Sequence, residues 1–190
     1  GIRRLDPQEY RMNPFYRQIR IPEAHFGNWK LTIEKYKPYE AFVCDDIRTD
    51  EELKEIPQIG FFDTEFSFPA VMEDGQEWMA IKPNEIETMR QPIARAAGQV
   101  VAFGLGMGYY AFMVSEKPEV KTLTIVERDE NVIALFREHI LPQFPKKEKI
   151  DIVRQDAFEF ATNCMSDGYY DHAFVDLWHD VSDGYPLYKQ

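Results

Sequence analysis

Residues 100–110 read V-V-A-F-G-L-G-M-G-Y-Y, a short apolar run followed by three glycines at alternate positions. The apolar run is typical of a buried strand, and the residues after Gly108 suit a helix over 109–117. Glycine permits positive φ angles and a close approach of a ligand to the main chain. A helix N-terminus adds free N–H donors and a positive dipole end. The stretch therefore predicts a nucleotide-like ligand at the end of the first strand of an α/β sheet.

The glycine spacing separates the known classes of nucleotide-binding loop. A dinucleotide loop reads G-x-G-x-x-G, and its third glycine would stand where this chain has Tyr109. A Walker loop would need Gly-Lys-Ser/Thr after the glycines, and this chain has no such run there. The pattern G-x-G-x-G thus argues against NAD and against a Walker loop, although a short glycine motif also occurs in ordinary loops.

Further strands and helices are predicted to alternate after the glycine loop, as in a parallel α/β sheet. The second strand ends at Glu127, nineteen residues after Gly108, where a carboxylate can accept ribose hydroxyls. A solvated acid at a strand end is the other interpretation of Glu127. The remaining predicted elements are a helix over Asp129–Pro142 with Asp129 as N-cap and a buried stripe of Val132, Leu135, Phe136 and Ile140, and strands over Leu123–Val126, Ile150–Val153 and His172–Val175.

Four motifs resemble those of class I S-adenosylmethionine-dependent methyltransferases, and the last three are similar to the spermidine-synthase branch of that superfamily. They are G-L-G-M-G at Gly104–Gly108, I-V-E-R-D at Ile125–Asp129, R-Q-D-A-F at Arg154–Phe158 and Y-D-H-A-F-V-D-L-W at Tyr170–Trp178. The resemblance covers roughly the second half of the chain. It implies a Rossmann-like, mostly parallel sheet with helices on both faces and with the fourth strand beside the first, and S-adenosyl-L-methionine as cofactor.

The resemblance also implies roles for single residues. The glycine loop, with Gly104, Leu105, Gly106 and Gly108, would approach the amino-acid part of the cofactor. Glu127 would hold the ribose hydroxyls, with Arg128 beside it. Asp156 and Ala157 would contact the adenine, although a helix N-cap also explains Asp156. Asp176 would lie at the cofactor and orient the acceptor. No metal site is expected.

Two residues depart from the patterns of these families. Many methyltransferases carry an acid two residues before the first glycine, where this chain has Ala102. The spermidine-synthase branch shares that gap, so cofactor binding stays compatible with it. That branch also carries an Asp-x-x-Asp pair after the fourth strand, whereas here Asp176 is followed by Asp180, one residue further on. The displacement weakens the case for aminopropyl transfer.

Composition limits the classes of partner and compartment. The chain has 190 residues, 44% of them hydrophobic, and a net charge of −11, which disfavours a nucleic-acid partner. Two cysteines, Cys44 and Cys164, suit a reducing, cytoplasmic setting, and no apolar run is long enough to span a bilayer. The chain ends shortly after the fourth predicted strand, which indicates a fragment whose sheet edge needs a cover, a second copy being one candidate.

The first part of the chain is expected to form a β-rich cap, residues 1–82, ahead of a cofactor domain, residues 83–190. Asp74-Gly75 predicts a hairpin turn. The other predicted elements are strands at Trp29–Ile33, Glu40–Cys44, Phe61–Phe68, Ala70–Glu73 and Glu77–Ile81, a helical turn at Asp50–Glu55, and a helix over Asn84–Ala97 with Asn84 as N-cap, a bend or break at Pro92 and Gly98 at its end.

Methyl transfer to a small-molecule or protein acceptor is the leading functional hypothesis from the sequence. The alternatives are an aminopropyltransferase acting on a diamine and a cofactor-binding or assembly module without turnover. The acceptor pocket is predicted beside Asp176–Asp180, where ligands of open α/β sheets collect. The rings of Phe61, Phe62 and Phe66–Phe68 are candidates to cover that pocket, with packing on the sheet as their other role. Tyr109 and Tyr110 would either wall the site or pack in the core.

Overall fold

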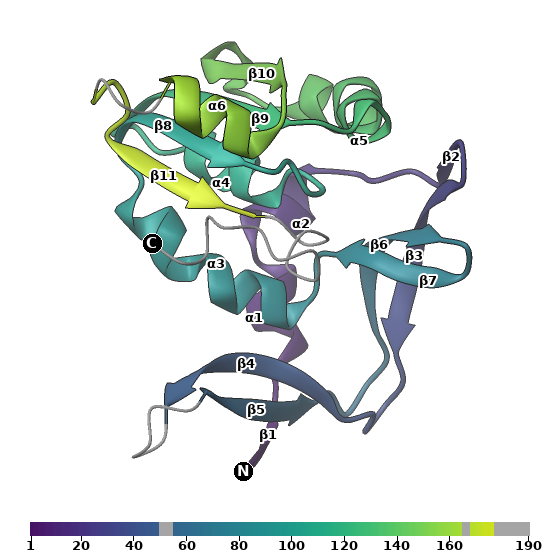
Figure 1. Ribbon diagram of the computed structural model, residues 1–190. Coiled ribbons are helices and arrows are strands. Elements are labelled where there is room, and N and C mark those ends of the chain that lie inside the picture. The colour runs from purple at the N-terminus through teal and green to yellow at the C-terminus, as the bar shows by residue number, and fades with distance from the viewer. Residues whose placement is uncertain (50–54, 165–167, 177–190) are drawn as a thin grey trace. The chain divides into compact units, whose positions relative to one another are not determined.

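The computed structural model of the chain describes residues 1–49, 55–164 and 168–176. These residues form two compact units, Gly1–Gln91 and the part from Pro92 onward, and each is described by itself. The division falls inside helix α3 (Pro83–Arg95), whereas the domain boundary predicted from the sequence lies between residues 82 and 83. Figure 1 labels the helices and strands of both units.

The second unit is built on a four-stranded parallel sheet. Its strands are β8 (Gly98–Phe103), β9 (Val120–Glu127), β10 (Ile150–Arg154) and β11 (His172–Val175). β9 pairs with β8 and β10, and β11 pairs with the other side of β8, so that the order is β10-β9-β8-β11. The structure thus confirms the four predicted strands and the position of the fourth beside the first.

Helices cover both faces of this sheet, as in a Rossmann-like fold. On one face, α6 (Ala157–Cys164) packs Ala157 and Phe160 against Val101, Phe103 and Val126. On the other face, α4 (Tyr109–Ser115) lays Tyr110 on Phe174 of β11, with the ring centroids 4.1 Å apart. Figure 1 shows α4 and α6 on opposite sides of β8. The apolar alternation of the strands supplies both buried faces, because successive side chains point to opposite sides.

The helix predicted from Asp129 to Pro142 changes type along its length. Asp129 caps α5 (Glu130–Leu135) as expected, since its side chain accepts the N–H groups of Asn131 and Val132. The chain then continues as a π-helix, η1 (Phe136–Ile140), and a 3-10 turn, η2 (Leu141–Gln143); a further 3-10 turn, η3 (Lys147–Lys149), precedes β10. Pro142 has no N–H to bond the carbonyl four residues earlier, so regular α-helical bonding cannot run through it. The predicted apolar stripe is nevertheless buried.

Helix α3 differs from its prediction at its two ends. It begins at Pro83, so Asn84 is not its N-cap, which accords with the preference of proline for the first helical position. The helix runs unbroken through Pro92 and ends at Arg95. The Nζ atom of Lys117 donates to the carbonyls of Ile93, Ala94 and Ala96 at 2.7, 2.9 and 2.6 Å, and so satisfies the groups left open at that end. Gly98 does not close the helix but begins β8.

The first unit contains two small sheets and two short helices. The sheet orders are β1-β5-β4 and β2-β3-β6-β7. Asp74 and Gly75 form the predicted hairpin turn between β6 and β7, with φ angles of +51° and +80°. The bounds are β1 (Ile2–Arg4), α1 (Pro7–Arg11), α2 (Pro14–Gln18), β2 (Ala24–Phe26), β3 (Trp29–Tyr36), β4 (Phe42–Thr49), β5 (Glu55–Phe61), β6 (Phe66–Glu73) and β7 (Gln76–Ala80).

The aromatic run at 61–68 is not the single strand that was predicted. β5 ends at Phe61 and β6 begins at Phe66, because the chain turns between them to bury Phe62. Phe62 and Phe66 are fully buried and stack with their ring centroids 4.3 Å apart, and Tyr10 meets both edge-on. These rings and the buried Phe68 therefore pack in the core of the first unit, which is one of the two roles expected for them. The helical turn predicted at Asp50–Glu55 lies outside the described residues, except that Glu55 begins β5.

Candidate functional site

The three glycines of the loop after β8 all have positive φ angles: +96° at Gly104, +57° at Gly106 and +90° at Gly108. A Cβ on Gly104 would collide with the main-chain carbonyl oxygen of Asp176, well inside the 3.0 Å that real Cβ contacts keep. A Cβ on Gly108 would lie 2.6 Å from the ring of Phe136. Two of the glycines are therefore required by the packing of the protein itself, besides any close approach of a ligand.

Helix α4 begins directly behind the loop, with Gly108 as its N-cap. Tyr109 and Tyr110 in its first turn are 6% and 5% exposed, so both belong to the core, one of the two roles expected for them. The Tyr110 hydroxyl is buried without a hydrogen-bond partner among the described residues, and burial raises the pKa of this phenol. Leu105 and Met107, the loop residues with side chains, are also buried, so the surface of the loop consists mainly of its main chain.

Glu127 ties the end of β9 to the glycine loop. Its Oε1 atom accepts the N–H of Leu105 and its Oε2 atom accepts the N–H of Asp129, each at 3.1 Å. Burial raises the pKa of this carboxyl, and the N–H groups of Asp129 and Leu105 oppose that shift. Each carboxylate oxygen has two acceptor lone pairs, so a bound main-chain N–H leaves capacity for a ligand hydroxyl on the same atom. Neither N–H partner was predicted from the sequence, since main-chain donors leave no residue pattern.

The end of β10 lies beside the end of β9. The N–H of Gln155 donates to the carbonyl of Glu127 at 3.2 Å, and the next residue, Asp156, accepts the N–H of Glu159 on its Oδ1 atom at 3.1 Å. Asp156 therefore has the N-cap role that was its other interpretation. Ala157 is buried against the sheet, so only its main chain can face a ligand. The exposed Arg128 follows Glu127 at the same edge.

Asp176 completes the row of strand ends on the other side of the loop. Its N–H donates to the carbonyl of Phe103 at 2.7 Å, and its carbonyl lies against Gly104. The structure thus brings Gly104, Glu127, Asp156 and Asp176 to one edge of the sheet, although they are distant in sequence. Trp178, His179 and Asp180, the rest of the predicted acceptor rim, lie outside the described residues.

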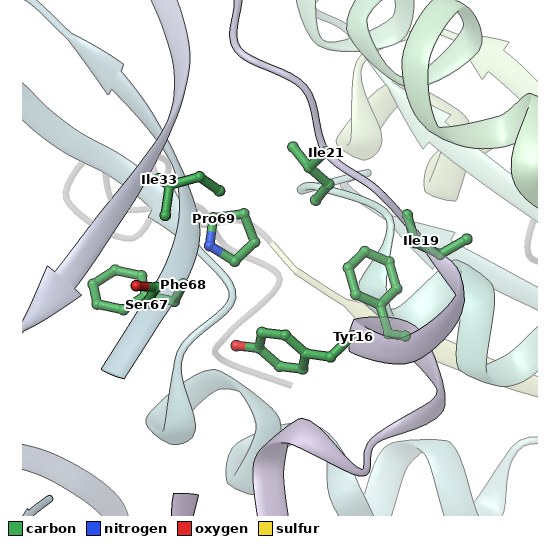
Figure 2. A pocket seen from close by; sticks show the side chains of 8 residues that line it. Tyr16, Ile19, Ile21, Ile33, Ser67, Phe68 and Pro69 are labelled. Carbon is green, nitrogen blue, oxygen red and sulfur yellow. The ribbon is translucent and has the colours of Figure 1, made fainter. Parts of the chain in front are cut away.

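An apolar cavity of about 140 Å³ in the first unit offers a different kind of site (Figure 2). Ile19, Ile21, Ile33 and Pro69 line it, and the hydroxyl of its Tyr16 donates to the carbonyl of Ile81. Hydroxyls are the polar side-chain groups among its lining residues, so it has no carboxylate, amine or imidazole for acid–base chemistry. The glycine-loop edge, which combines main-chain donors with carboxylates, is therefore the candidate functional site.

Two further properties of the described residues bear on other functions. No group of three or more His, Cys, Asp and Glu side chains there is placed to hold a metal ion. None of the helices in that part of the chain combines the length and the apolar character needed to cross a membrane.

Removing the Glu127 carboxylate should weaken binding of an adenosine ligand. We expect Glu127→Ala to bind S-adenosylhomocysteine roughly ten- to a hundredfold more weakly, because two charge-assisted hydroxyl bonds are worth about 1.5–3 kcal/mol. Isothermal titration calorimetry measures the change. Asp151→Ala, which removes an exposed acid from β10 away from this edge, is the control and should bind as the wild type does. Equal affinity of Glu127→Ala and wild type would place the ribose elsewhere.

Comparisons with known proteins come from families, curated sequences and solved structures. Residues 48–190 match the family described as the Spermine/spermidine synthase domain. No curated protein sequence matches the chain. Among solved structures, spermidine synthase from Thermotoga maritima matches with 15% sequence identity and a TM-score of 0.45. The match covers 60% of this chain and 43% of that protein, so this chain spans less than half the length of that structure.

Proposed function

The chain belongs to the spermine/spermidine synthase domain family, and on that premise we propose that it is a transferase that moves an aminopropyl group from decarboxylated S-adenosylmethionine to an amine. The family match over residues 48–190 favours this alternative over the methyl transfer that the sequence analysis put first. The observation that carries the proposal is the row of strand ends: glycine loop, Glu127 and Asp176 end three adjacent strands of one parallel sheet. Ligands of such sheets bind outside the carboxyl ends of the strands.

The residues at this edge fit an adenosine-bearing donor. Glu127 would hold the ribose hydroxyls, since its two oxygens accept one main-chain N–H each, from Leu105 in the loop and from Asp129 after β9, and keep further acceptor capacity. The main chain of the glycine loop would lie along the chain that carries the sulfonium sulfur. Asp156 and the main chain of Ala157, at the end of β10, would meet the adenine.

The chemistry of the transfer asks for orientation and for one proton acceptor. The amine nitrogen attacks the propyl carbon bonded to sulfur; a C–N bond forms, the C–S bond breaks, and its electron pair stays on sulfur as a thioether. The amine must be neutral to attack, so a base has to take its proton. We assign this role to Asp176, because its main chain is fixed against Gly104 beside the loop where the donor would lie. Alignment of the reacting atoms supplies much of the acceleration.

Methyl transfer from S-adenosylmethionine is the second candidate, and one observation favours it. The donor for methyl transfer carries a carboxylate, which suits main-chain N–H groups, whereas the decarboxylated donor carries only an ammonium group, which suits an acid. Within the described loop, Leu105 and Met107 are buried and apolar, and no residue of Gly104–Gly108 has a carboxylate. The two donors therefore have to be compared directly.

A donor assay separates the two candidates. The protein is incubated with S-adenosylmethionine or its decarboxylated form, together with a primary diamine, and the nucleoside products are identified by mass spectrometry. We expect 5′-methylthioadenosine from the decarboxylated donor as the main product and little S-adenosylhomocysteine from S-adenosylmethionine, because the family match favours transfer of the aminopropyl group.

Asp176→Asn tests the assigned proton acceptor in the same assay. The amide keeps the shape of the side chain but cannot take the proton, so turnover should fall while the donor still binds.

In the donor assay with the wild type, S-adenosylhomocysteine as the main product would support methyl transfer instead. Binding of the donor without any product would favour the cofactor-binding module and contradict the proposed transfer.

A further inference from the structure

The order of the strands sets the direction in which a bound nucleoside extends. With the glycine loop at the end of β8 and the ribose at Glu127 on β9, the next strand outward is β10. The N–H of Gln155 donates to the main-chain carbonyl of Glu127, and this bond keeps the start of α6 beside the end of β9. A base attached to a ribose held at Glu127 therefore reaches the segment from Asp156 to Phe158. This step rests on the proposed function, which places an adenosine-bearing donor at the edge.

Phe158 is the large apolar side chain of α6 that the protein leaves outside its core. Ala157 and Phe160 point into the cluster on the sheet and are 7% and 5% exposed, with Ala161 and Cys164 packed beside them. Phe158 falls between these positions and is 49% exposed. It is the second residue of α6, after the N-cap Asp156, and only Gln155 and Asp156 separate the end of β10 from the start of this helix.

We propose that Phe158 is a stacking platform for the purine base of the donor and a determinant of its affinity. An exposed phenyl ring at a nucleoside-binding edge offers a flat apolar face, and aromatic side chains of this kind stack on bases. The exposed part of this side chain is available to the base. Because every base has such a face, the contact raises affinity for the nucleoside without reading its hydrogen-bonding groups.

The test measures binding of 5′-methylthioadenosine by calorimetry to the wild type and to Phe158→Ala. We expect the alanine variant to bind roughly five- to a hundredfold more weakly, the range that base–aromatic stacking covers. 5′-Methylthioinosine should lose affinity by a similar factor, because stacking does not depend on the exocyclic group of the base. Phe158→Tyr retains a ring and should keep most of the affinity.

Tyr169→Ala is the matched control. Tyr169 is 54% exposed in the same unit but follows α6 instead of starting it, and its removal should leave the affinity unchanged. Thermal unfolding without ligand checks that each variant is folded. We expect both to fold, because the two rings are exposed and contribute little to the core. Unchanged affinity in Phe158→Ala, or a loss confined to one of the two bases, would overturn the stacking role.

The inference and the proposed function fail in different ways. If Phe158→Ala binds normally and the wild type still transfers an aminopropyl group, the stacking role is wrong and the function stands. If the wild type transfers nothing but binds 5′-methylthioadenosine through Phe158, the function is wrong and the stacking role stands. If the wild type binds no adenosine compound, the stacking role is wrong as well.

Discussion

Gly104→Ala should destabilise the second unit by about 4 kcal/mol or more, at the high end of what single substitutions do. The added Cβ would collide with the carbonyl oxygen of Asp176, which is main chain and cannot rotate away. To make room, the ends of β8 and β11 would have to separate, and the bond from the N–H of Asp176 to the carbonyl of Phe103 would be lost. The φ angle of +96° adds strain for any residue with a side chain.

Thermal unfolding followed by far-UV circular dichroism measures this effect. A loss of that size should lower the melting temperature by roughly 10 °C or more in a chain of this length. Gly75→Ala is the matched control, because Gly75 also has a positive φ, +80°, but has open space where a Cβ would stand. It should cost only the backbone strain, about 1–2 kcal/mol. Similar losses in the two variants would mean that the contact with Asp176 is unimportant.

Glu85→Gln should stabilise the first unit at alkaline pH and flatten its dependence on pH. Glu85 is 6% exposed, and its Oε2 atom has no hydrogen-bond partner among the described residues. Burial is the largest cause that raises the pKa of this carboxyl from 4.5 to about 7, while the charge of Lys82 opposes the shift. Lys82 itself pairs with Glu77 at 2.6 Å, so its charge is shared with another carboxylate.

The sign of the pH effect follows from proton binding. Between pH 4.5 and 7 the folded protein holds a proton on Glu85 that the unfolded chain releases, so stability falls as the pH rises through this window. Above pH 7 the full penalty for a buried charge is present, on the order of 3 kcal/mol. Glutamine carries no charge, so the variant should avoid this loss above pH 7 and gain little at pH 5.

Urea unfolding at pH 5 and pH 8.5, followed by tryptophan fluorescence, measures the difference. Trp29 and Trp78 lie in contact in the first unit and report on its unfolding. Glu116→Gln, which removes an exposed carboxylate in the second unit, is the control and should keep the pH dependence of the wild type. A Glu85→Gln variant that is as sensitive to pH as the wild type would show that Glu85 is not the titrating group.

The sequence by itself determined the elements whose cause is local. The apolar runs and the glycine loop predicted strand, turn and helix, because side-chain periodicity and backbone freedom act over a few neighbouring residues. Asp129 as N-cap and Asp74-Gly75 as hairpin turn were confirmed for the same reason. The position of the fourth strand beside the first was also predicted from the sequence, through the resemblance of its motifs to those of class I methyltransferases.

The tertiary structure alone decided the features that depend on residues far apart in the chain. Gly104 must be glycine because Asp176 lies against it, and Glu127 accepts the N–H of Leu105 in the loop; neither contact leaves a pattern in the sequence. Phe62 and Phe66 were predicted on one strand, but burying both rings in one cluster required a turn between them. Such outcomes follow from packing between distant segments, which overrides local preference when it buries more apolar surface.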